Sequence, residues 1–308
     1  MKVSKDTKNY YPHDQIDNLN LWKNIKEVEE IGYTVIPSTK VASEDRRRLI
    51  LKTILKIAEH KTGNSIDVKS NASPGKYKAL PQTDSQFVLY SLLFEDPIFE
   101  EWVMNDVILS MSAYFLKNQA QLSSMSSFIK WKGKNYKSSL GLHADTQPSP
   151  NGKLPIDWTD ACNSAYCLTD YTKDNGALAV VPKSHKFARQ PSSMDDFKKI
   201  NVIPVEAPAG SLIFWHGNLW HGAYPKLTDG LRVNLTTFMT HRRIKTQENI
   251  KLKVTQEMLT RNPSKQFARI VGLNDSNGFD QKGPDMNGII DYGTKDQMKR
   301  FTFNVKDL

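Results

Sequence analysis

The period of the apolar pattern changes near residue 122, and this change constrains the fold more than any other feature of the sequence. Before it, apolar residues recur at every third or fourth position over 15–31, from Ser43 to near Gly63, and over 97–118, which predicts three helices. After it, short alternating runs are separated by Gly, Pro, Asn and Asp, as in an all-β sandwich or barrel. The predicted fold is therefore mainly β, with N-terminal helices bracing one side of a β core.

The predicted strands and the divisions of the chain follow from the same pattern. One strand is expected between the first two helices, and seven follow the change of period: 33–37, 125–132, 138–144, 161–169, 177–181, 201–206, 211–216 and 231–240. Residues 64–85 are polar and irregular. We expect a single domain over 1–308, with a helical N-terminal part and lid loop at 1–120, a catalytic core at 121–243 and a C-terminal extension at 244–308.

Composition narrows the class of protein. The 42 Lys and Arg against 33 Asp and Glu give a net charge of +9, but these residues are scattered apart from short clusters at 46–48 and 241–243. This favours solvated surface and attraction of anionic small molecules over nucleic-acid binding. Two cysteines, Cys162 and Cys167, are too few for a disulfide framework or a cysteine-rich zinc site. Without a stretch of roughly 20 apolar residues or an apolar leader, a soluble, cytoplasmic monomer or homodimer is expected.

Three separated segments carry residue types that bind metals and carboxylates. His143 and Asp145 are two residues apart, so in a strand their side chains share one face, although such a pair often occurs by chance. His221 follows the apolar run that begins at Gly210. Two histidines and one carboxylate form the facial triad of oxygen-activating Fe(II), which leaves metal positions open for other ligands. Arg232 lies eleven residues after His221, at the start of a predicted strand, where its guanidinium can bind a carboxylate such as the far one of 2-oxoglutarate.

Residues from Ser138 to about Arg243 resemble the catalytic core of the phytanoyl-CoA dioxygenase family of Fe(II)/2-oxoglutarate-dependent oxygenases. The resemblance rests on His143-x-Asp145, on Asp174-Asn-Gly-Ala-Leu178 with Val181-Pro-Lys-Ser-His-Lys186, and on Gly210-Ser-Leu-Ile-Phe214 with His221 eleven residues before Arg232. Residues 29–36 resemble the N-terminal entry of the family. In the family's Pro-Gly-Ser-His turn, this chain has Lys183 in place of the glycine. The resemblance implies a double-stranded β-helix (jelly-roll, cupin-like) fold for the core.

The resemblance also implies cofactors and site residues. The cofactors are Fe(II), 2-oxoglutarate and O2, with ascorbate as a reductant in vitro. The expected metal ligands are His143, Asp145 and His221. The expected cosubstrate anchor is Arg232. Further contacts are expected from Asn234 and Thr236 on the strand face of Arg232, from Asn163 on another strand and from Thr146 beside the ligands, with plain barrel lining or packing as the alternative for these four.

The implied reaction is oxidation of an unactivated C–H bond in a small metabolite of specialised biosynthesis, with release of succinate and CO2. Related halogenases lack the carboxylate ligand, so Asp145 favours hydroxylation, desaturation or oxidative cyclisation. The net charge favours a carboxylate-bearing substrate. Lysine or arginine side chains of the N-terminal helical part, or of the lid loop at 64–85 with Lys69, Lys76 and Lys78, are expected to hold it.

Alternatives remain at this stage. His216 is the other histidine near the end of the same apolar run, but the eleven-residue interval to Arg232 favours His221, and we expect a structural hydrogen bond from His185. A cupin-like metal-dependent hydrolase or isomerase without 2-oxoglutarate would give Arg232 no role. A basic, non-catalytic binding module would need aromatic residues among the basic clusters, and the sequence has few there.

Overall fold

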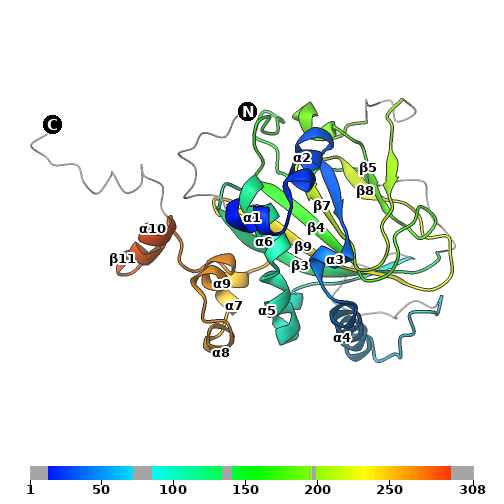
Figure 1. Ribbon diagram of the computed structural model, residues 1–308, viewed down its shortest axis with the longest axis horizontal. Coiled ribbons are helices and arrows are strands. Elements are labelled where there is room, and N and C mark those ends of the chain that lie inside the picture. The colour runs from blue at the N-terminus through cyan, green and yellow to red at the C-terminus, as the bar shows by residue number, and fades with distance from the viewer. Residues whose placement is uncertain (1–12, 72–84, 134–140, 194, 196–198, 293–308) are drawn as a thin grey trace, which may run out of the picture.

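The computed structural model describes residues 13–71, 85–133, 141–193, 195 and 199–292 (Figure 1). The helices are α1 (His13–Asn18), α2 (Trp22–Ile31), α3 (Ser38–Val41), α4 (Glu44–Thr62), η2 (Leu92–Phe94), α5 (Pro97–Val103), α6 (Asp106–Phe115), η3 (Ser184–Phe187), α7 (Ile250–Lys253), α8 (Gln256–Arg261), α9 (Lys265–Ile270) and α10 (Met286–Tyr292). The strands are β1 (Tyr33–Ile36), β2 (Gln86–Leu89), β3 (Ala120–Lys130), β4 (Ala161–Cys167), β5 (Leu178–Val180), β6 (Ile203–Val205), β7 (Leu212–His216), β8 (His221–Ala223), β9 (Arg232–His241), β10 (Phe279–Asp280) and β11 (Gly283–Pro284).

Two antiparallel sheets form the core. The larger has six strands in the order β1-β7-β4-β9-β3-β2, and the smaller has three in the order β6-β5-β8. An isolated antiparallel bridge between His143 and His221 adds a further segment beside β8. This arrangement confirms the predicted jelly roll. Of the strand expected at 138–144, residues 138–140 lie outside the described residues, and residue 143 makes only that bridge.

Both edges of the larger sheet come from the N-terminal part of the chain. β1 pairs with β7, and β2 pairs with β3. The strand at β1 was predicted from its alternation, and it is confirmed. β2 was not predicted, because its four residues directly follow a polar, irregular stretch. The part expected to be helical, residues 1–120, therefore also contributes two strands to the sheet.

The ends of α4 follow the predicted capping signals. The Ser43 hydroxyl accepts a hydrogen bond from the Arg46 amide, which satisfies one of the free amides at the start of the helix. Gly63 ends it with φ 72°, a left-handed conformation that glycine adopts without steric strain. Gly32 ends α2 in the same way, with φ 94°.

Two predicted helices are each divided. The helix expected over 15–31 is interrupted at Asn20, which has φ 51°, so that α1 and α2 are separate. The helix expected over 97–118 is interrupted at Asn105, whose side chain accepts hydrogen bonds from the Val107 and Ile108 amides and starts α6. Asparagine offers the backbone this alternative to a continuous helix, which the apolar period alone does not reveal.

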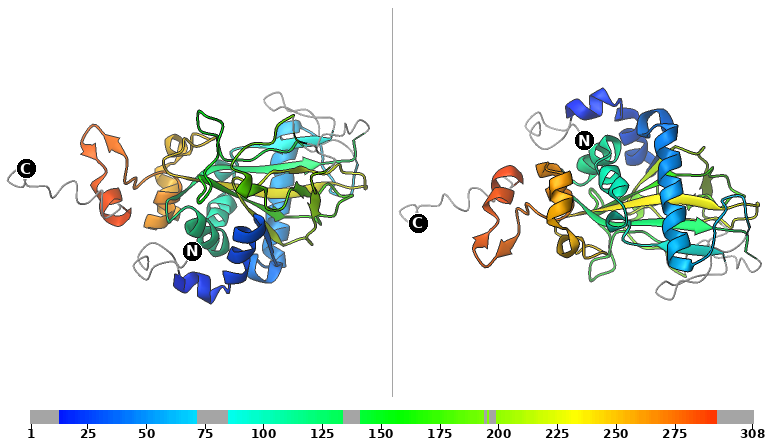
Figure 2. Two further views of the ribbon diagram at one scale, coloured as in Figure 1. Left: turned by 90° about the horizontal axis from the view of Figure 1, so that it is seen from above. Right: turned by 90° about the horizontal axis from the view of Figure 1, so that it is seen from below.

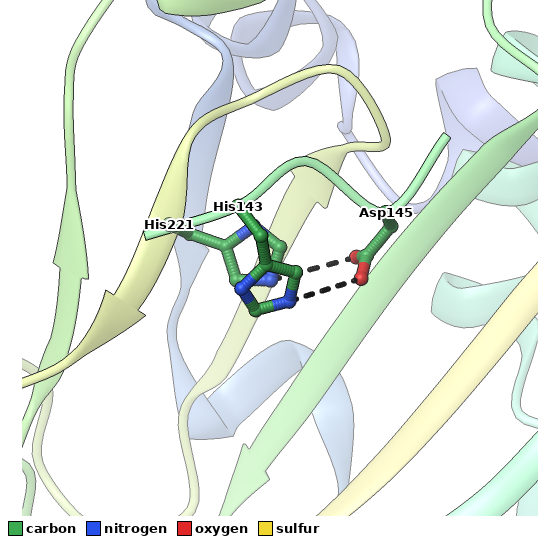
Figure 3. Close-up of side chains that lie close together, drawn as sticks. All are labelled: His143, Asp145 and His221. Carbon is green, nitrogen blue, oxygen red and sulfur yellow. Dashed lines mark ion pairs between the residues drawn. The ribbon is translucent and has the colours of Figure 1, made fainter. Parts of the chain in front are cut away.

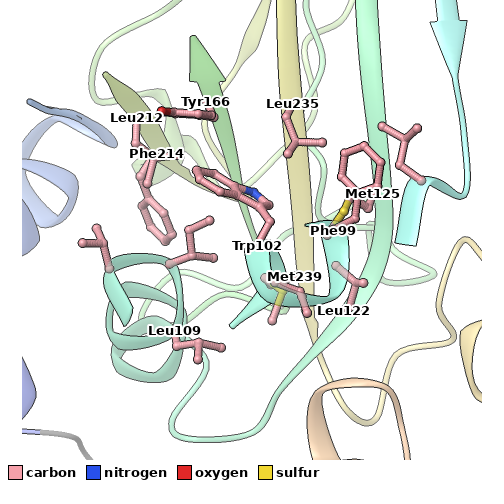
Figure 4. Packing of buried hydrophobic residues seen from close by; sticks show 14 of the residues in the cluster. Phe99, Trp102, Leu109, Leu122, Met125, Tyr166, Leu212, Phe214, Leu235 and Met239 are labelled. Atoms are coloured by element: carbon pink, nitrogen blue, oxygen red, sulfur yellow. The ribbon is translucent and has the colours of Figure 1, made fainter. Parts of the chain in front are cut away.

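The helices pack against one face of the larger sheet (Figures 1 and 2), as the sequence predicted. Val233 and Leu235 of β9 belong to this apolar layer, whereas Arg232 and Asn234 lie on the opposite face, which follows the two-residue period of a strand. In Figure 4, Trp102 of α5 stacks on Tyr166 of β4, with ring centroids 4.4 Å apart. Burial of each large apolar side chain contributes about 1.5–3 kcal/mol, so this layer fixes the sheet and leaves its other face for the site.

After β9 the C-terminal segment forms α7, α8 and α9, which pack at one end of the larger sheet with Ile250, Met258 and Phe267 in its apolar core, and α10 lies beyond them (Figures 1 and 2). Its first residues are bonded to the core, because Glu248 accepts from the Ser91 amide at 2.8 Å and the Gln247 amide donates to Ser123 Oγ at 3.0 Å. Among the described residues, the helices are too short or too polar for one to span a membrane.

Candidate metal centre

His143, Asp145 and His221 meet at the rim of the smaller sheet (Figure 3). The bridge between the two histidines has both backbone hydrogen bonds, each 2.9 Å long, so the two residues lie directly opposite each other. His143 Nε2 lies 3.7 Å from Asp145 Oδ1, and His221 Nε2 lies 3.6 Å from Asp145 Oδ2. One donor atom from each side chain falls within 4.8 Å of the others, which is a suitable arrangement for one metal ion.

Hydrogen bonds fix which nitrogen of each histidine is available. His143 Nδ1 lies 2.8 Å from the Gly141 carbonyl, and His221 Nδ1 lies 2.9 Å from the Leu219 carbonyl. A carbonyl only accepts, so each Nδ1 carries the hydrogen and each Nε2 presents its lone pair toward Asp145. Burial lowers the pKa of His221, although Asp145 acts in the opposite direction. The neutral ring is the form that ligates metals.

The Asp145 carboxylate is held by two donors from the larger sheet. Asn163 Nδ2 donates to Oδ2 at 3.2 Å, and Trp215 Nε1 donates to the same oxygen at 3.1 Å. Such contacts orient a metal ligand and are a regular part of metal sites. Oδ1 receives no hydrogen bond from the residues that the structure describes. The donor set of two Nε2 atoms and one carboxylate therefore fits Fe(II).

A cavity of about 440 Å³ opens from this centre between the two sheets. The residues that line it include His143, Asp145, Asn163, Tyr171, Trp215, His221, Gln86, Lys130, Arg232, Asn234, Thr236, Phe238 and Gln247. Most come from alternate positions of the larger sheet, on the face away from the helices. The metal centre and the expected cosubstrate arginine thus share one cavity.

Arg232 is buried at the start of β9, and Tyr171 positions it. The guanidinium carbon lies 4.6 Å from the centre of the Tyr171 ring, and Arg232 Nη1 donates to the Tyr171 hydroxyl. Burial raises the pKa of Tyr171 to about 12, so the ring remains a neutral phenol. Arg232 Nε is buried, and none of the described residues accepts from it. A buried N–H donor without an acceptor is costly, and the carboxylate of 2-oxoglutarate fits as its partner.

The other predicted cosubstrate residues divide into two groups. Asn163, Asn234 and Thr236 line the cavity. Asn163 contacts Asp145, and Asn234 Oδ1 accepts from the Phe128 amide at 2.9 Å. Thr146 is not among the lining residues, and its hydroxyl lies 3.2 Å from that of Thr159. Its position does not support the expected cosubstrate contact, because the side chain is buried against Thr159 and does not line the cavity.

His216 and His185 lie apart from the metal centre. His216 belongs to the face of β7 that packs against the helices, with its ring 6.2 Å from Phe115. Burial lowers its pKa to about 3, and its Nδ1 accepts from the Asn218 amide. His185 Nε2 lies 3.1 Å from the Glu29 carbonyl, which agrees with the expected structural hydrogen bond. The geometry places His221, and not His216, beside Asp145.

The fold and this site together define the class of protein: a jelly roll with a His-Asp-His group that can hold a metal ion. Solved structures with the same fold include the epimerase SnoN in complex with Fe3+, alpha ketoglutarate and nogalamycin RO, with a TM-score of 0.55 at 17% identity over 78% of this chain and 91% of that one. HygX from Streptomyces hygroscopicus, with nickel and 2-oxoglutarate bound, has a TM-score of 0.55 at 14% identity over 73% of this chain and 88% of that one. These likenesses confirm the fold.

Sequence comparison gives the family. The profile of the family described as Phytanoyl-CoA dioxygenase (PhyH) matches residues 28–234. Dioxygenase af480 of Aspergillus fumigatus is 30% identical over 136 residues, which are 44% of this chain and 41% of that protein, so the match spans about two fifths of the relative. The chain belongs to the phytanoyl-CoA dioxygenase (PhyH) family. Membership confirms the predicted resemblance.

Proposed function

We propose that His143 and His221, through Nε2, and Asp145, through its carboxylate, hold Fe(II), and that Arg232 binds the far carboxylate of 2-oxoglutarate. The observation that carries this assignment is the convergence of the three donor atoms, within 4.8 Å, on a cavity that also contains a buried arginine. The two ligand types and the arginine fit the metal and the cosubstrate of the family.

Fe(II) with 2-oxoglutarate and O2 supplies the oxidising power for a C–H bond, and succinate and CO2 are released. The residues of the chain bind and orient the metal and the cosubstrate. The Gly141 and Leu219 carbonyls hold the two histidine rings, and Asn163 and Trp215 hold the carboxylate of Asp145. The Tyr171 ring and hydroxyl hold Arg232 from the side. The His221 and Asp145 side chains are 6% and 12% exposed, whereas that of His143 is 55% exposed, so the metal position is open to solvent on the His143 side.

For the substrate, we propose a small, carboxylate-bearing metabolite of specialised biosynthesis that undergoes hydroxylation, desaturation or oxidative cyclisation. Support comes from the carboxylate ligand Asp145, from the net charge of +9, and from the similarity in fold to SnoN, an epimerase from nogalamycin biosynthesis. Of the lysines proposed to hold the substrate, Lys69 is exposed, and Lys76 and Lys78 lie outside the described residues.

The test replaces Arg232 with lysine, which keeps the charge and loses the planar fork that matches a carboxylate. The apparent KM for 2-oxoglutarate, measured by succinate formation, should rise about tenfold or more, which corresponds to about 1.4 kcal/mol. Arg47→Lys is the matched control, because Arg47 is also largely buried but bonds to the Leu168 carbonyl and Glu44 on the helix side. An unchanged KM in the Arg232 variant would contradict the assignment.

A further inference from the structure

The segment from His143 to Thr146, which carries two of the proposed metal ligands, is held along both of its edges. On one edge, the amide and carbonyl of His143 exchange two hydrogen bonds of 2.9 Å with those of His221. On the other edge, the side chain of Gln190 takes the place of a neighbouring strand. Its Oε1 accepts from the Ala144 amide at 2.8 Å, and its Nε2 donates to the Ala144 carbonyl at 2.9 Å and to the Thr146 carbonyl at 3.1 Å.

These bonds use the primary amide of Gln190 fully and fix its orientation. A backbone N–H only donates and a carbonyl only accepts, so Oε1 faces the Ala144 amide and Nε2 faces the two carbonyls. Each of the two Nε2 hydrogens has one acceptor. Because the side chain exchanges both bonds with Ala144, it acts as the backbone of a hydrogen-bonded neighbour does in an antiparallel sheet.

The same bonds hold the peptide planes beside His143 and Asp145. The plane that follows His143 donates its N–H to Gln190, and the plane that precedes Asp145 directs its carbonyl to the same side chain. The planes on either side of a Cα atom set the direction in which its side chain leaves the backbone. Gln190 therefore acts on both ligands through the backbone that carries them.

The loop that carries Gln190 is itself fixed by other bonds. The Arg189 carbonyl accepts from Trp220 Nε1 at 2.8 Å, and the Arg189 guanidinium donates to both carboxylate oxygens of Asp195, at 2.6 and 2.9 Å. Trp220 is fully buried and directly precedes the ligand His221. The two segments that carry the metal ligands are thus joined to one loop, and Gln190 extends from a part of the backbone that is already held.

We propose that Gln190 is a positioning residue for the metal centre, which holds His143 and Asp145 in the arrangement that binds Fe(II) before the metal arrives. The inference rests on the function proposed above and adds a residue from a different loop. A site that is already ordered does not have to be ordered by the ligand, so that cost is not subtracted from the binding free energy. Without Gln190, the amide and carbonyl of Ala144 and the carbonyl of Thr146 lose their partner, and the segment should open more readily.

Fe(II) affinity measures the positioning. Gln190→Met keeps the length of the side chain and removes its hydrogen bonds, whereas Gln190→Glu keeps an acceptor and loses both donors. Anaerobic Fe(II) titration against a coloured chelator should show about tenfold weaker binding in both variants, the lower end for a residue that orients metal ligands. Gln121→Met is the matched control, because Gln121 Nε2 also donates to a backbone carbonyl, that of Ile244 at 2.8 Å, but does not line the cavity. The control should lower thermal stability and leave Fe(II) affinity unchanged.

Hydrogen exchange of the metal-free protein separates positioning from general stability. A peptide that contains residues 143–146 should exchange faster in both Gln190 variants than in the wild type, because the Ala144 amide has lost its acceptor. Fe(II) should slow this exchange more in the variants than in the wild type, since the metal then has to order the segment. In Gln121→Met the same peptide should exchange as it does in the wild type.

Three outcomes would contradict these expectations. Wild-type Fe(II) affinity in both Gln190 variants, with binding abolished in Asp145→Ala, would overturn this inference alone, and faster exchange would then make Gln190 a structural residue only. Weaker Fe(II) binding with unchanged exchange over 143–146 would also overturn the inference, because the loss would not come from this segment. Undiminished Fe(II) binding in Asp145→Ala would overturn the proposed function itself.

Discussion

Trp215→Phe tests how the protein holds Asp145. The indole Nε1 of Trp215 donates to Asp145 Oδ2 at 3.1 Å, beside the Asn163 amide at 3.2 Å. Phenylalanine keeps an aromatic ring on this buried face of β7, where the indole now lies 5.1 Å from the ring of His221, but it has no donor. The substitution therefore removes one of two hydrogen bonds that fix the carboxylate, and it leaves all three metal ligands in place.

The expected loss follows from that geometry. A hydrogen bond to a charged group contributes about 1.5–3 kcal/mol, and loss of a residue that orients a ligand lowers metal affinity about 10–100-fold. Because Asn163 still holds the same oxygen, we expect the lower end, about tenfold in the dissociation constant for Fe(II), or ~1.4 kcal/mol. Asn163→Ala should have a similar effect, and the double variant should lose more than the sum of the two, since none of the described residues then donates to Oδ2.

Anaerobic Fe(II) titration in competition with a coloured chelator measures the affinity. Trp102→Phe is the matched control, because Trp102 is also buried and donates one hydrogen bond, to Thr237 Oγ1 at 3.1 Å, but on the helix side of the sheet. The control should lower thermal stability and leave Fe(II) affinity unchanged. If the Trp215 and Asn163 variants and their combination all bind Fe(II) as tightly as the wild type, the carboxylate does not depend on these donors and the reasoning is refuted.

Three further outcomes are expected. Metal analysis should show that stoichiometric Fe(II) binding is abolished in His143→Ala, Asp145→Ala and His221→Ala and is retained in His216→Ala. Undiminished iron in the His221 variant would contradict the ligand assignment. Lys183 has φ 68°, a left-handed conformation that costs a non-glycine residue about 1–2 kcal/mol. Glycine avoids this cost but makes the unfolded chain more flexible, so Lys183→Gly should raise the free energy of unfolding by about 0.5–1 kcal/mol. A lower denaturant midpoint for this variant would count against the account. For an acidic metabolite that supports succinate formation, kcat/KM should fall with added salt while kcat stays constant, and a flat kcat/KM would speak against electrostatic capture.

The sequence predicted the parts of the fold that depend on local pattern. Ser43 and Gly63 predicted where α4 begins and ends, because helix capping depends on one or two hydrogen bonds between residues close in sequence. The long strands β4 and β9 were visible because each alternates over several residues. β8 was missed as a strand, since its three residues, from His221 to Ala223, are too few to show a period, and the bridge to His143 that aligns it comes from a distant segment.

The same limit explains which site residues were missed. His143, Asp145, His221 and Arg232 stand in motifs with characteristic spacing, so they can be found without a structure. Trp215 and Tyr171 lie in no such motif, and their roles depend on the register between β7 and β4 and on the loop that follows β4. Lys130 shares a strand face with Ser126 and Phe128, which the sequence shows. Its place beside Arg232 follows only from the pairing of β3 with β9, which the sequence does not show. Gln247 comes to the cavity from the C-terminal segment through bonds to Ser123 and Ser124.

The edge strand β1 is synthesised long before the strand with which it pairs. β1 pairs with β7, and more than half of the chain separates them. A ribosome adds about 5–20 residues per second, so β1 remains without its partner for roughly 9–35 s after it has been made. During that time its backbone groups can pair with another chain, because an unpaired strand is a template for association. Faster elongation, or a chaperone that covers β1, should therefore raise the yield of folded protein.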